Sequence, residues 1–179
     1  MVKFRADGKY VATGGQDNVL RIWQLHTFES LLQQELLPSN SCQRVPLLQP
    51  KPFKEWYNFH QSDIFEINWS PKDPSSPYLL SVSADCLVVI WNINFEKPIQ
   101  ILQHSDILCS ALFIKPTSEN YVASGCFDKM IRVWNVNQRK VIDWQQTNNY
   151  ITAMQINQAG DKLVVGLVDG VCLVYDYSK

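Results

Sequence analysis

Residues 81–92, SVSADCLVVIWN, are repeated with small changes at residues 124–135, SGCFDKMIRVWN. Weaker copies read TGGQDNVLRIWQ at residues 13–24 and VGLVDGVCLVYD at residues 165–176. In each copy an aspartate stands six positions before an aromatic residue, and the last three aromatic residues are 43 and 41 positions apart. Each copy alternates apolar side chains on either side of a polar turn, which is the pattern of two strands joined by a hairpin. The chain therefore contains four copies of one strand–turn–strand unit, and this internal period determines the architecture.

A period near 40 residues is typical of a propeller blade. The copies resemble the repeats of WD-repeat proteins, and the resemblance covers almost the whole chain apart from residues 26–51. The Trp-Asp dipeptide of that family reads Trp-Gln, Trp-Asn, Trp-Asn and Tyr-Asp here, but the turn aspartate is present in all four copies. The resemblance implies an all-β fold, a WD-repeat β-propeller segment of four blades whose last blade lacks its outer strand. We expect one partial propeller over residues 1–179, with its blades at residues 1–59, 60–103, 104–145 and 146–179.

Residues 26–51 interrupt the period, because Trp23 and Trp91 are 68 positions apart. We interpret this segment as an insertion between the third and fourth strands of the first blade. Apolar residues at helical spacing predict a short amphipathic helix from Phe28 to Leu37, and Pro38 follows it directly. Such a helix needs an apolar surface, either on its own blade, which we favour, or in the groove of a partner.

Four blades are fewer than the seven most common in the family, and an open arc leaves the faces of its end blades uncovered. Three explanations follow: a fragment of a larger propeller, a half-propeller that pairs with another, or a closed ring of four blades. We expect the first, because the stability of a repeat depends on neighbours at both of its ends.

Composition limits the function further. The 179 residues carry a net charge of −1 with a pI near 6.3, so no basic surplus is available for nucleic acid. No apolar run reaches the length of about 18 residues that a membrane span needs, and the first residues do not form a signal peptide. The five cysteines lack CxxC spacing and are interpreted as reduced thiols, which favours a cytoplasmic protein. The three histidines lie in different blades without ligand spacing, so we expect no metal and no cofactor.

A second set of residues repeats with the aspartate. A serine or threonine stands four positions before it, and in two copies a histidine stands about 24 positions before it. In WD-repeat proteins these residues form a hydrogen-bonded chain from Trp to Ser or Thr, then to His and Asp. The matching residues here are His60, Ser81, Asp85 and Trp91; His104, Ser124, Asp128 and Trp134; Thr13, Asp17 and Trp23; and Asp169 alone in the last blade. Because Val165 and Tyr175 replace the serine and tryptophan there, the fourth blade is expected to be the loosest.

A Ser-His-Asp set also suggests a hydrolase, in which Ser81 would be the nucleophile. However, the set occurs in two consecutive blades, its serine lies within a strand, and no G-x-S-x-G elbow is present. We therefore predict a structural network and no enzyme activity, with the hydrolase as the alternative.

Partner binding is then expected on the blade face that carries the turns between second and third strands. The side chains beside the network residues point outward there, and among them Asp63, Ile107, Phe127, Lys129 and Tyr150 form the candidate partner surface. The alternative for Phe127 is packing against a neighbouring loop. A reader of peptide marks would need an aromatic cage on this face, and none is evident from the sequence.

Within the family, residues 53–177 are most similar to the rabphilin-type WD-repeat proteins that bind endosomal Rab GTPases. The similarity depends on Phe59-His60 followed by Asp63, on LQHSDIL at residues 102–108, and on the last repeat ending in Tyr175. It implies a scaffold for protein–protein interactions in vesicle traffic, peripheral to endomembranes, with a small GTPase or a trafficking factor as partner. Because the GTPase-binding part of that family precedes the propeller, we do not expect these 179 residues to bind the GTPase on their own.

Overall fold

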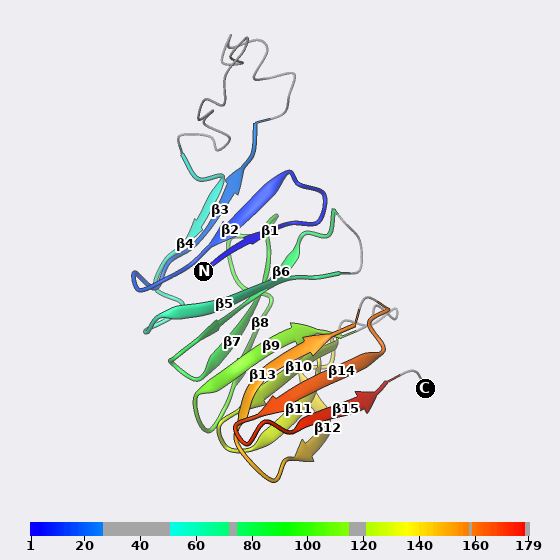
Figure 1. The fold of residues 1–179 in the computed structure, drawn as a ribbon. Helices are drawn as coiled ribbons and strands as arrows, with labels where there is room; N and C mark the ends of the chain where they lie inside the picture. Colours follow the sequence, from blue (N-terminus) through cyan, green and yellow to red (C-terminus); the bar gives the residue numbers. More distant parts are fainter. Residues whose placement is uncertain (27–50, 72–74, 115–120, 158, 178–179) are drawn as a thin grey trace, which may run out of the picture.

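The computed structural model describes residues 1–26, 51–71, 75–114, 121–157 and 159–177. In these ranges all 15 regular elements are strands, and they form four antiparallel sheets (Figure 1). The predicted all-β class and the four-blade propeller segment are therefore confirmed. The helix predicted at residues 28–37 lies outside the described residues.

Each sheet is a meander in which neighbouring strands are also neighbours in the chain. The first sheet contains β1 (Val2–Phe4), β2 (Tyr10–Thr13), β3 (Leu20–Gln24) and β4 (Lys54–Trp56). The second contains β5 (Ile64–Trp69), β6 (Tyr78–Ser83), β7 (Leu87–Asn92) and β8 (Gln100–Gln103). The third contains β9 (Leu108–Phe113), β10 (Tyr121–Cys126), β11 (Met130–Asn135) and β12 (Lys140–Gln146). The fourth contains three described strands, β13 (Ile151–Ile156), β14 (Lys162–Leu167) and β15 (Cys172–Asp176).

The same tight turn joins the second and third strands of every sheet. The residue after the repeat aspartate is left-handed in all four turns, with φ of 59° at Asn18, 67° at Cys86, 66° at Lys129 and 84° at Gly170. The aspartate stabilises this conformation, because its Oδ1 accepts the backbone N–H two residues later. These N···O distances are 3.3, 3.1, 3.0 and 3.2 Å from the first sheet to the fourth. The aspartate recurs because each hairpin needs this local acceptor.

Three apolar cores lie between consecutive sheets. In β6, Leu79 packs in the core between the first and second sheets, whereas Leu80 and Val82 pack in the core between the second and third. Both faces of β6 are therefore buried, which explains why apolar residues stand on both sides of this strand. Burial of this kind contributes roughly 1.5–3 kcal/mol for each large aliphatic side chain.

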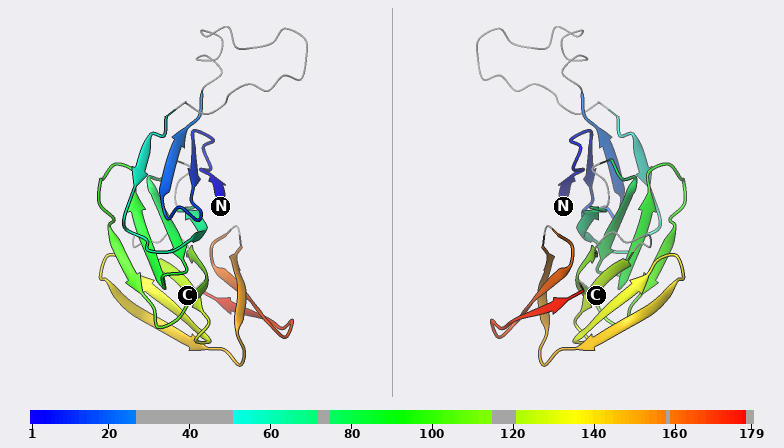
Figure 2. Two further views of the ribbon diagram at one scale, coloured as in Figure 1. Left: turned by 90° about the vertical axis from the view of Figure 1, so that its left-hand side faces the viewer. Right: turned by 90° about the vertical axis from the view of Figure 1, so that its right-hand side faces the viewer.

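The first strands of the four sheets lie beside one another, since β1 contacts β5, β5 contacts β9, and β9 contacts β13. In Figure 2 the outer strands of the first three sheets lie along one side of the molecule, and β1 and β13 lie on the other. We call β1, β5, β9 and β13 the inner strands. Their first residues are next to the aspartate turns, because Gly14 packs against Ile64 and the Ala84 N–H donates to the Asp63 carbonyl at 3.1 Å.

Candidate functional site

The second sheet brings four of the predicted network residues together. The Trp91 indole Nε1–H donates to Ser81 Oγ at 2.8 Å, and Ser81 Oγ is 2.7 Å from His60 Nε2. His60 Nδ1 is 3.0 Å from Asp85 Oδ2, which also accepts the Gln61 backbone N–H at 2.9 Å. The network thus joins the turn after β6 to the loop that precedes β5.

The direction of each hydrogen bond in this network follows from the chemistry of its ends. The indole can only donate and the ionised Asp85 can only accept. Ser81 therefore accepts from Trp91 and donates to His60 Nε2, and the His60 Nδ1–H donates to Asp85. Burial lowers the pKa of His60 below its ordinary value, although the neighbouring Asp85 carboxylate opposes this shift. A neutral imidazole completes the chain of hydrogen bonds with no unpaired group.

The third sheet forms only part of the expected network. Trp134 Nε1–H donates to Ser124 Oγ at 2.9 Å, and Ser124 Oγ is 2.8 Å from His104 Nε2. Within the described residues, however, no hydrogen bond joins His104 to Asp128, and the buried His104 Nδ1 has no partner. The link that the resemblance implies between these two residues is not formed here.

Arg132 is the reason for this difference. Its guanidinium binds both carboxylate oxygens of Asp128, at 2.6 and 3.2 Å, and the Ser105 hydroxyl donates to Asp128 at 2.6 Å. Burial by itself would raise the pKa of Asp128, but the hydrogen bonds from Arg132, Ser105 and the Met130 N–H lower it to about 2. A bidentate arginine is a stronger partner for a carboxylate than a neutral imidazole. Burial, together with the nearby Arg132 charge, lowers the pKa of His104 to about 4.

The first sheet has the same arginine arrangement. Trp23 Nε1–H donates to Thr13 Oγ1 at 2.8 Å, while Asp17 forms an ion pair with Arg21. The Arg21 Nε–H also donates to Glu55 on β4 at 2.8 Å, so the arginine connects the turn to the outer strand.

The fourth sheet retains the turn but lacks the indole–hydroxyl–imidazole chain. The Asn149 side-chain amide donates to Asp169 Oδ2 at 3.4 Å, from the part of the loop where the other sheets have histidine. Val165 stands at the serine position and is buried, so no hydroxyl is available there. The exposed Asp169 is consequently the most weakly held of the four aspartates.

Arg21, Arg132 and Asn149 were not identified in the sequence as network residues. The signal for the two arginines was present, because D-x-x-x-R occurs at residues 17–21 and 128–132 but not in the second or fourth repeat. In a tight hairpin this spacing places the arginine on the following strand, next to the aspartate.

The predicted partner surface lies beside these networks. In the second, third and fourth sheets the residue before the inner strand accepts a backbone N–H from the residue before the aspartate. The pairs are Asp63 with Ala84 at 3.1 Å, Ile107 with Phe127 at 2.9 Å, and Tyr150 with Val168 at 3.0 Å. The same two positions are therefore polar and small in the second sheet but apolar in the third and fourth.

The apolar pairs form one continuous patch. The Phe127 and Tyr150 rings meet edge to face, with centroids 6.3 Å apart, and the Lys129 ammonium lies 4.9 Å above the Tyr150 ring. The four apolar side chains are between 39% and 59% exposed, which is unusual for neighbouring large apolar residues. We call Ile107, Phe127, Tyr150 and Val168, with Lys129, the turn cluster. Phe127 both packs against a neighbouring loop and remains accessible, so the two interpretations of this residue are compatible.

Other chemistry has little support in the described part of the chain. No group of three or more metal-ligating side chains is found among the described residues. No described helix has the length and apolar character to cross a membrane.

Comparison with known proteins agrees with the repeat architecture. The family profile described as "WD domain, G-beta repeat" matches residues 2–24, 52–92 and 96–135. An uncharacterized WD repeat-containing protein of Schizosaccharomyces pombe is 28% identical over 177 residues, which cover 94% of this chain and 29% of that protein. WD repeat-containing protein 44 of Xenopus laevis is 28% identical over 210 residues, covering 98% of this chain and 22% of that protein.

A shorter match involves about half of the chain. Protein HIR1 of Kluyveromyces lactis is 34% identical over 97 residues, covering 54% of this chain and 10% of that protein. The chain spans less than a third of the length of each of these three relatives.

Proposed function

We propose, from the premise that this chain belongs to the WD-repeat family, that it is a non-catalytic scaffold on which partner proteins dock at the turn cluster. WD repeats imply protein–protein interaction, and the exposed apolar patch supports the turn cluster as the docking site on this chain. The observation that carries the proposal is the contact between Phe127 and Tyr150, which joins the apolar pairs of two sheets into one surface. Clustered aromatic side chains are common at the centres of protein interfaces.

Rigid turns make this surface suitable for binding. The turns of the third and fourth sheets are each held by their aspartate and by a backbone hydrogen bond to the preceding loop, as in the 2.9 Å bond between Phe127 and Ile107. A partner therefore immobilises few side chains when it docks, and less binding free energy is lost to ordering.

The network geometry disfavours the hydrolase alternative. Ser81 has no exposed surface, and its oxygen already contacts both Trp91 and His60. A nucleophile must reach its substrate with an oxyanion site nearby. We infer that Ser81, His60 and Asp85 serve stability.

The experiment that tests the docking site compares a double variant with a single control variant. Phe127→Ser with Tyr150→Ser removes the aromatic centre of the turn cluster, and Phe95→Ser is the control, because Phe95 is also exposed, at 58%, but lies between β7 and β8. Quantitative affinity capture should show that one set of proteins bound by the wild-type chain is lost from the double variant and retained by the control. Equal retention by both variants would refute the assignment.

We further propose that the interactions serve vesicle traffic linked to a Rab-family GTPase at the cytoplasmic side of endomembranes. The support is the similarity of residues 53–177 to rabphilin-type WD-repeat proteins. Co-precipitation of a Rab-family GTPase with the full-length protein, stronger with the GTP-bound than with the GDP-bound form, is the expected result. No enrichment of any Rab-family member over an unrelated WD-repeat protein would contradict this proposal without affecting the docking site.

A further inference from the structure

Exposed carboxylates stand beside the turn cluster on the same end of the sheets. Asp106 directly precedes Ile107, and Asp169 directly follows Val168, so each is a chain neighbour of an apolar residue of the cluster. Asp63 holds in the second sheet the position that Ile107 holds in the third. All three aspartates are exposed. We call Asp63, Asp106 and Asp169 the acidic border.

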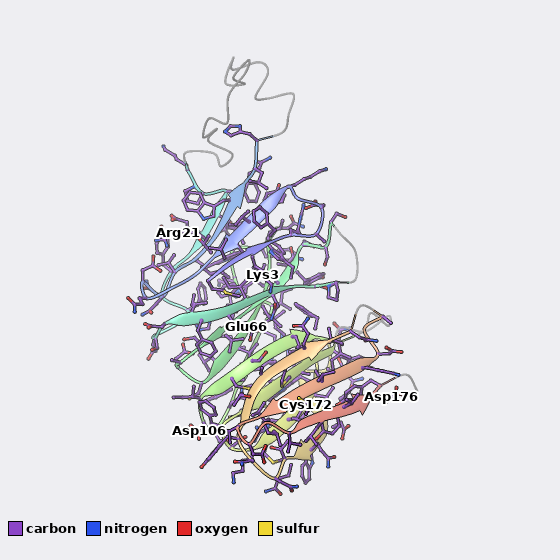
Figure 3. The ribbon with its side chains drawn as sticks, in the orientation of Figure 1. Lys3, Arg21, Glu66, Asp106, Cys172 and Asp176 are labelled. Carbon is purple, nitrogen blue, oxygen red and sulfur yellow. The ribbon has the colours of Figure 1, made fainter. Side chains whose placement is uncertain are left out.

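Asp106 lies where the second and third sheets meet. In the third sheet, its backbone carbonyl accepts the Cys126 thiol at 3.2 Å. Burial raises the pKa of the Cys86 thiol in the turn of the second sheet, and the Asp106 charge adds to this shift. Figure 3 shows Asp106 and Asp176 at opposite ends of the strands. The Asp106 carboxylate is therefore next to the turns of two neighbouring sheets, at the end that carries the turn cluster.

The carboxylates of the acidic border keep their negative charges. Among the residues that the structure describes, none of the three forms an ion pair. Asp106 Oδ1 accepts the Ile107 N–H at 2.7 Å, and Asp169 accepts the Val171 N–H and the Asn149 amide. These donors are neutral, so they leave the charge of each carboxylate in place.

The cations on this end of the last three sheets do not cancel the acidic border. The Arg132 guanidinium binds both carboxylate oxygens of Asp128, so these two charges offset each other. The two histidines of the networks are buried, which lowers their pKa and leaves them neutral at pH 7. The remaining cation beside the described part of the cluster is Lys129, 4.9 Å above the Tyr150 ring. Three carboxylates and one ammonium leave a surplus of two negative charges, on a chain whose net charge is only −1.

This charge distinguishes between classes of partner. Nucleic acid and anionic lipid present phosphates, which the acidic border repels. A protein segment with an apolar side chain between arginine or lysine residues complements both parts of the surface. Its apolar side chain can cover the Phe127 and Tyr150 rings, while its cations pair with the surrounding carboxylates. Opposite charge also increases the rate at which such a segment associates.

We propose that the turn cluster binds a basic segment of a partner protein. In this complex an aromatic or large aliphatic side chain contacts Phe127 and Tyr150, and flanking arginine or lysine residues pair with the acidic border. The inference rests on the proposed docking at the turn cluster and adds the chemical class of the partner. The apolar contact supplies most of the affinity, because exposed ion pairs contribute little each, and the carboxylates select basic over acidic partners.

Fluorescence anisotropy with the whole 179-residue chain tests this class of partner. Three fluorescein-labelled peptides are compared: Arg-Lys-Phe-Leu-Lys-Arg, the charge-reversed Glu-Asp-Phe-Leu-Asp-Glu, and Arg-Lys-Ala-Ala-Lys-Arg, which lacks the apolar centre. Saturable binding at about 0.15 M salt is expected for the first peptide alone. The double variant Phe127→Ser with Tyr150→Ser should abolish it.

Asp106→Lys and Asp143→Lys are a matched pair of variants. Both aspartates are exposed, and each accepts the backbone N–H of the next residue, at 2.7 and 2.8 Å. Asp143, however, lies on the outer strand β12. Asp106→Lys should weaken binding of the first peptide at least fivefold, because a repulsion replaces an attraction. Asp143→Lys should change it less than twofold, since salt screens charges beyond about 8 Å. Thermal melts should show that both variants remain folded.

The proposal is overturned if the first peptide shows no saturable binding, if either of the other peptides binds equally well, or if the two aspartate variants have equal effects. These results concern only the class of partner. Loss of captured proteins from the Phe127→Ser and Tyr150→Ser double variant would still support the docking site. Equal capture by that variant and by Phe95→Ser would refute the docking site and this inference together.

Discussion

Replacement of Asp85 by alanine tests whether the complete network in the second sheet stabilises the protein. The carboxylate accepts three hydrogen bonds, from His60 Nδ1 at 3.0 Å, from the Gln61 N–H at 2.9 Å and from the Leu87 N–H at 3.1 Å. The side chains of His60 and Asp85 are only 1% and 8% exposed. The variant therefore leaves a buried imidazole N–H with no acceptor.

The expected loss of stability follows from this unpaired group. A buried donor without a partner costs about 1–3 kcal/mol, whereas the exposed Gln61 N–H can bind water instead. The turn is also weakened, because the Leu87 N–H loses its acceptor. Together we expect these losses in Asp85→Ala to lower the free energy of unfolding by about 2–3 kcal/mol. For a chain of this size that corresponds to a fall in Tm of roughly 4–12 °C.

Asp169→Ala is the control at the same repeat position. Asp169 is exposed and accepts only the Val171 N–H at 3.2 Å and the Asn149 amide at 3.4 Å. Its loss should cost less than about 1 kcal/mol, since water can replace the carboxylate. Urea unfolding followed by circular dichroism measures both variants. Equal losses of stability in the two variants would refute the view that burial of the His60–Asp85 link makes the network stabilising.

Two further predictions concern the third sheet. The pKa of His104 is about 4 in the folded chain and 6.5 ordinarily, so protons bind the unfolded chain more readily between these values and stability falls as the pH drops from 6.5 towards 4. His104 should contribute a loss of about 2 kcal/mol at pH 5 in urea unfolding. His104→Gln should remove this contribution and leave that of His60, whose pKa is also lowered; an unchanged pH profile in the variant would contradict the assignment. Gly125→Ala should cost about 1–3 kcal/mol, because the added Cβ overlaps Met154 Sδ and lies 3.0 Å from Cys109 Sγ. Gly166→Ala, the equivalent change in the fourth sheet, has no atom nearer than 3.6 Å and should be close to neutral in the same assay; a reversed order of the two would argue against the packing described.

The sequence was sufficient to predict the strands and turns because they depend on short-range rules. Three local features all lie within one repeat. They are the alternation of side chains along each strand, the polar residues of the turn, and the aspartate two residues before the backbone N–H that it accepts. Pairs such as Trp91 with Ser81 could be predicted too, because opposite strands of one hairpin fix their distance. The structure confirms the all-β propeller segment for these reasons.

The partners of the aspartates could not be predicted in the same way, because two donors compete for each carboxylate. Asp85 pairs with His60, whereas Asp128 pairs with Arg132 and leaves His104 Nδ1 unpaired. Whether the carboxylate pairs with histidine or arginine depends on the presence of an arginine four residues later and on the geometry of that side chain.

The repeat separates stability from recognition by placing them at adjacent positions. Asp85, Asp128 and Asp169 hold the turn, and the residue before each of them is alanine, phenylalanine or valine and faces outward. In the second, third and fourth sheets the backbone hydrogen bond between the two outward positions is made whichever side chains stand there, because it joins a main-chain N–H to a main-chain carbonyl. Substitution at these positions can therefore create or remove an apolar surface without loss of the turn. This explains why the turn cluster covers the third and fourth sheets but not the second, whose turn is held by the most complete network and whose outward residues are Asp63 and Ala84.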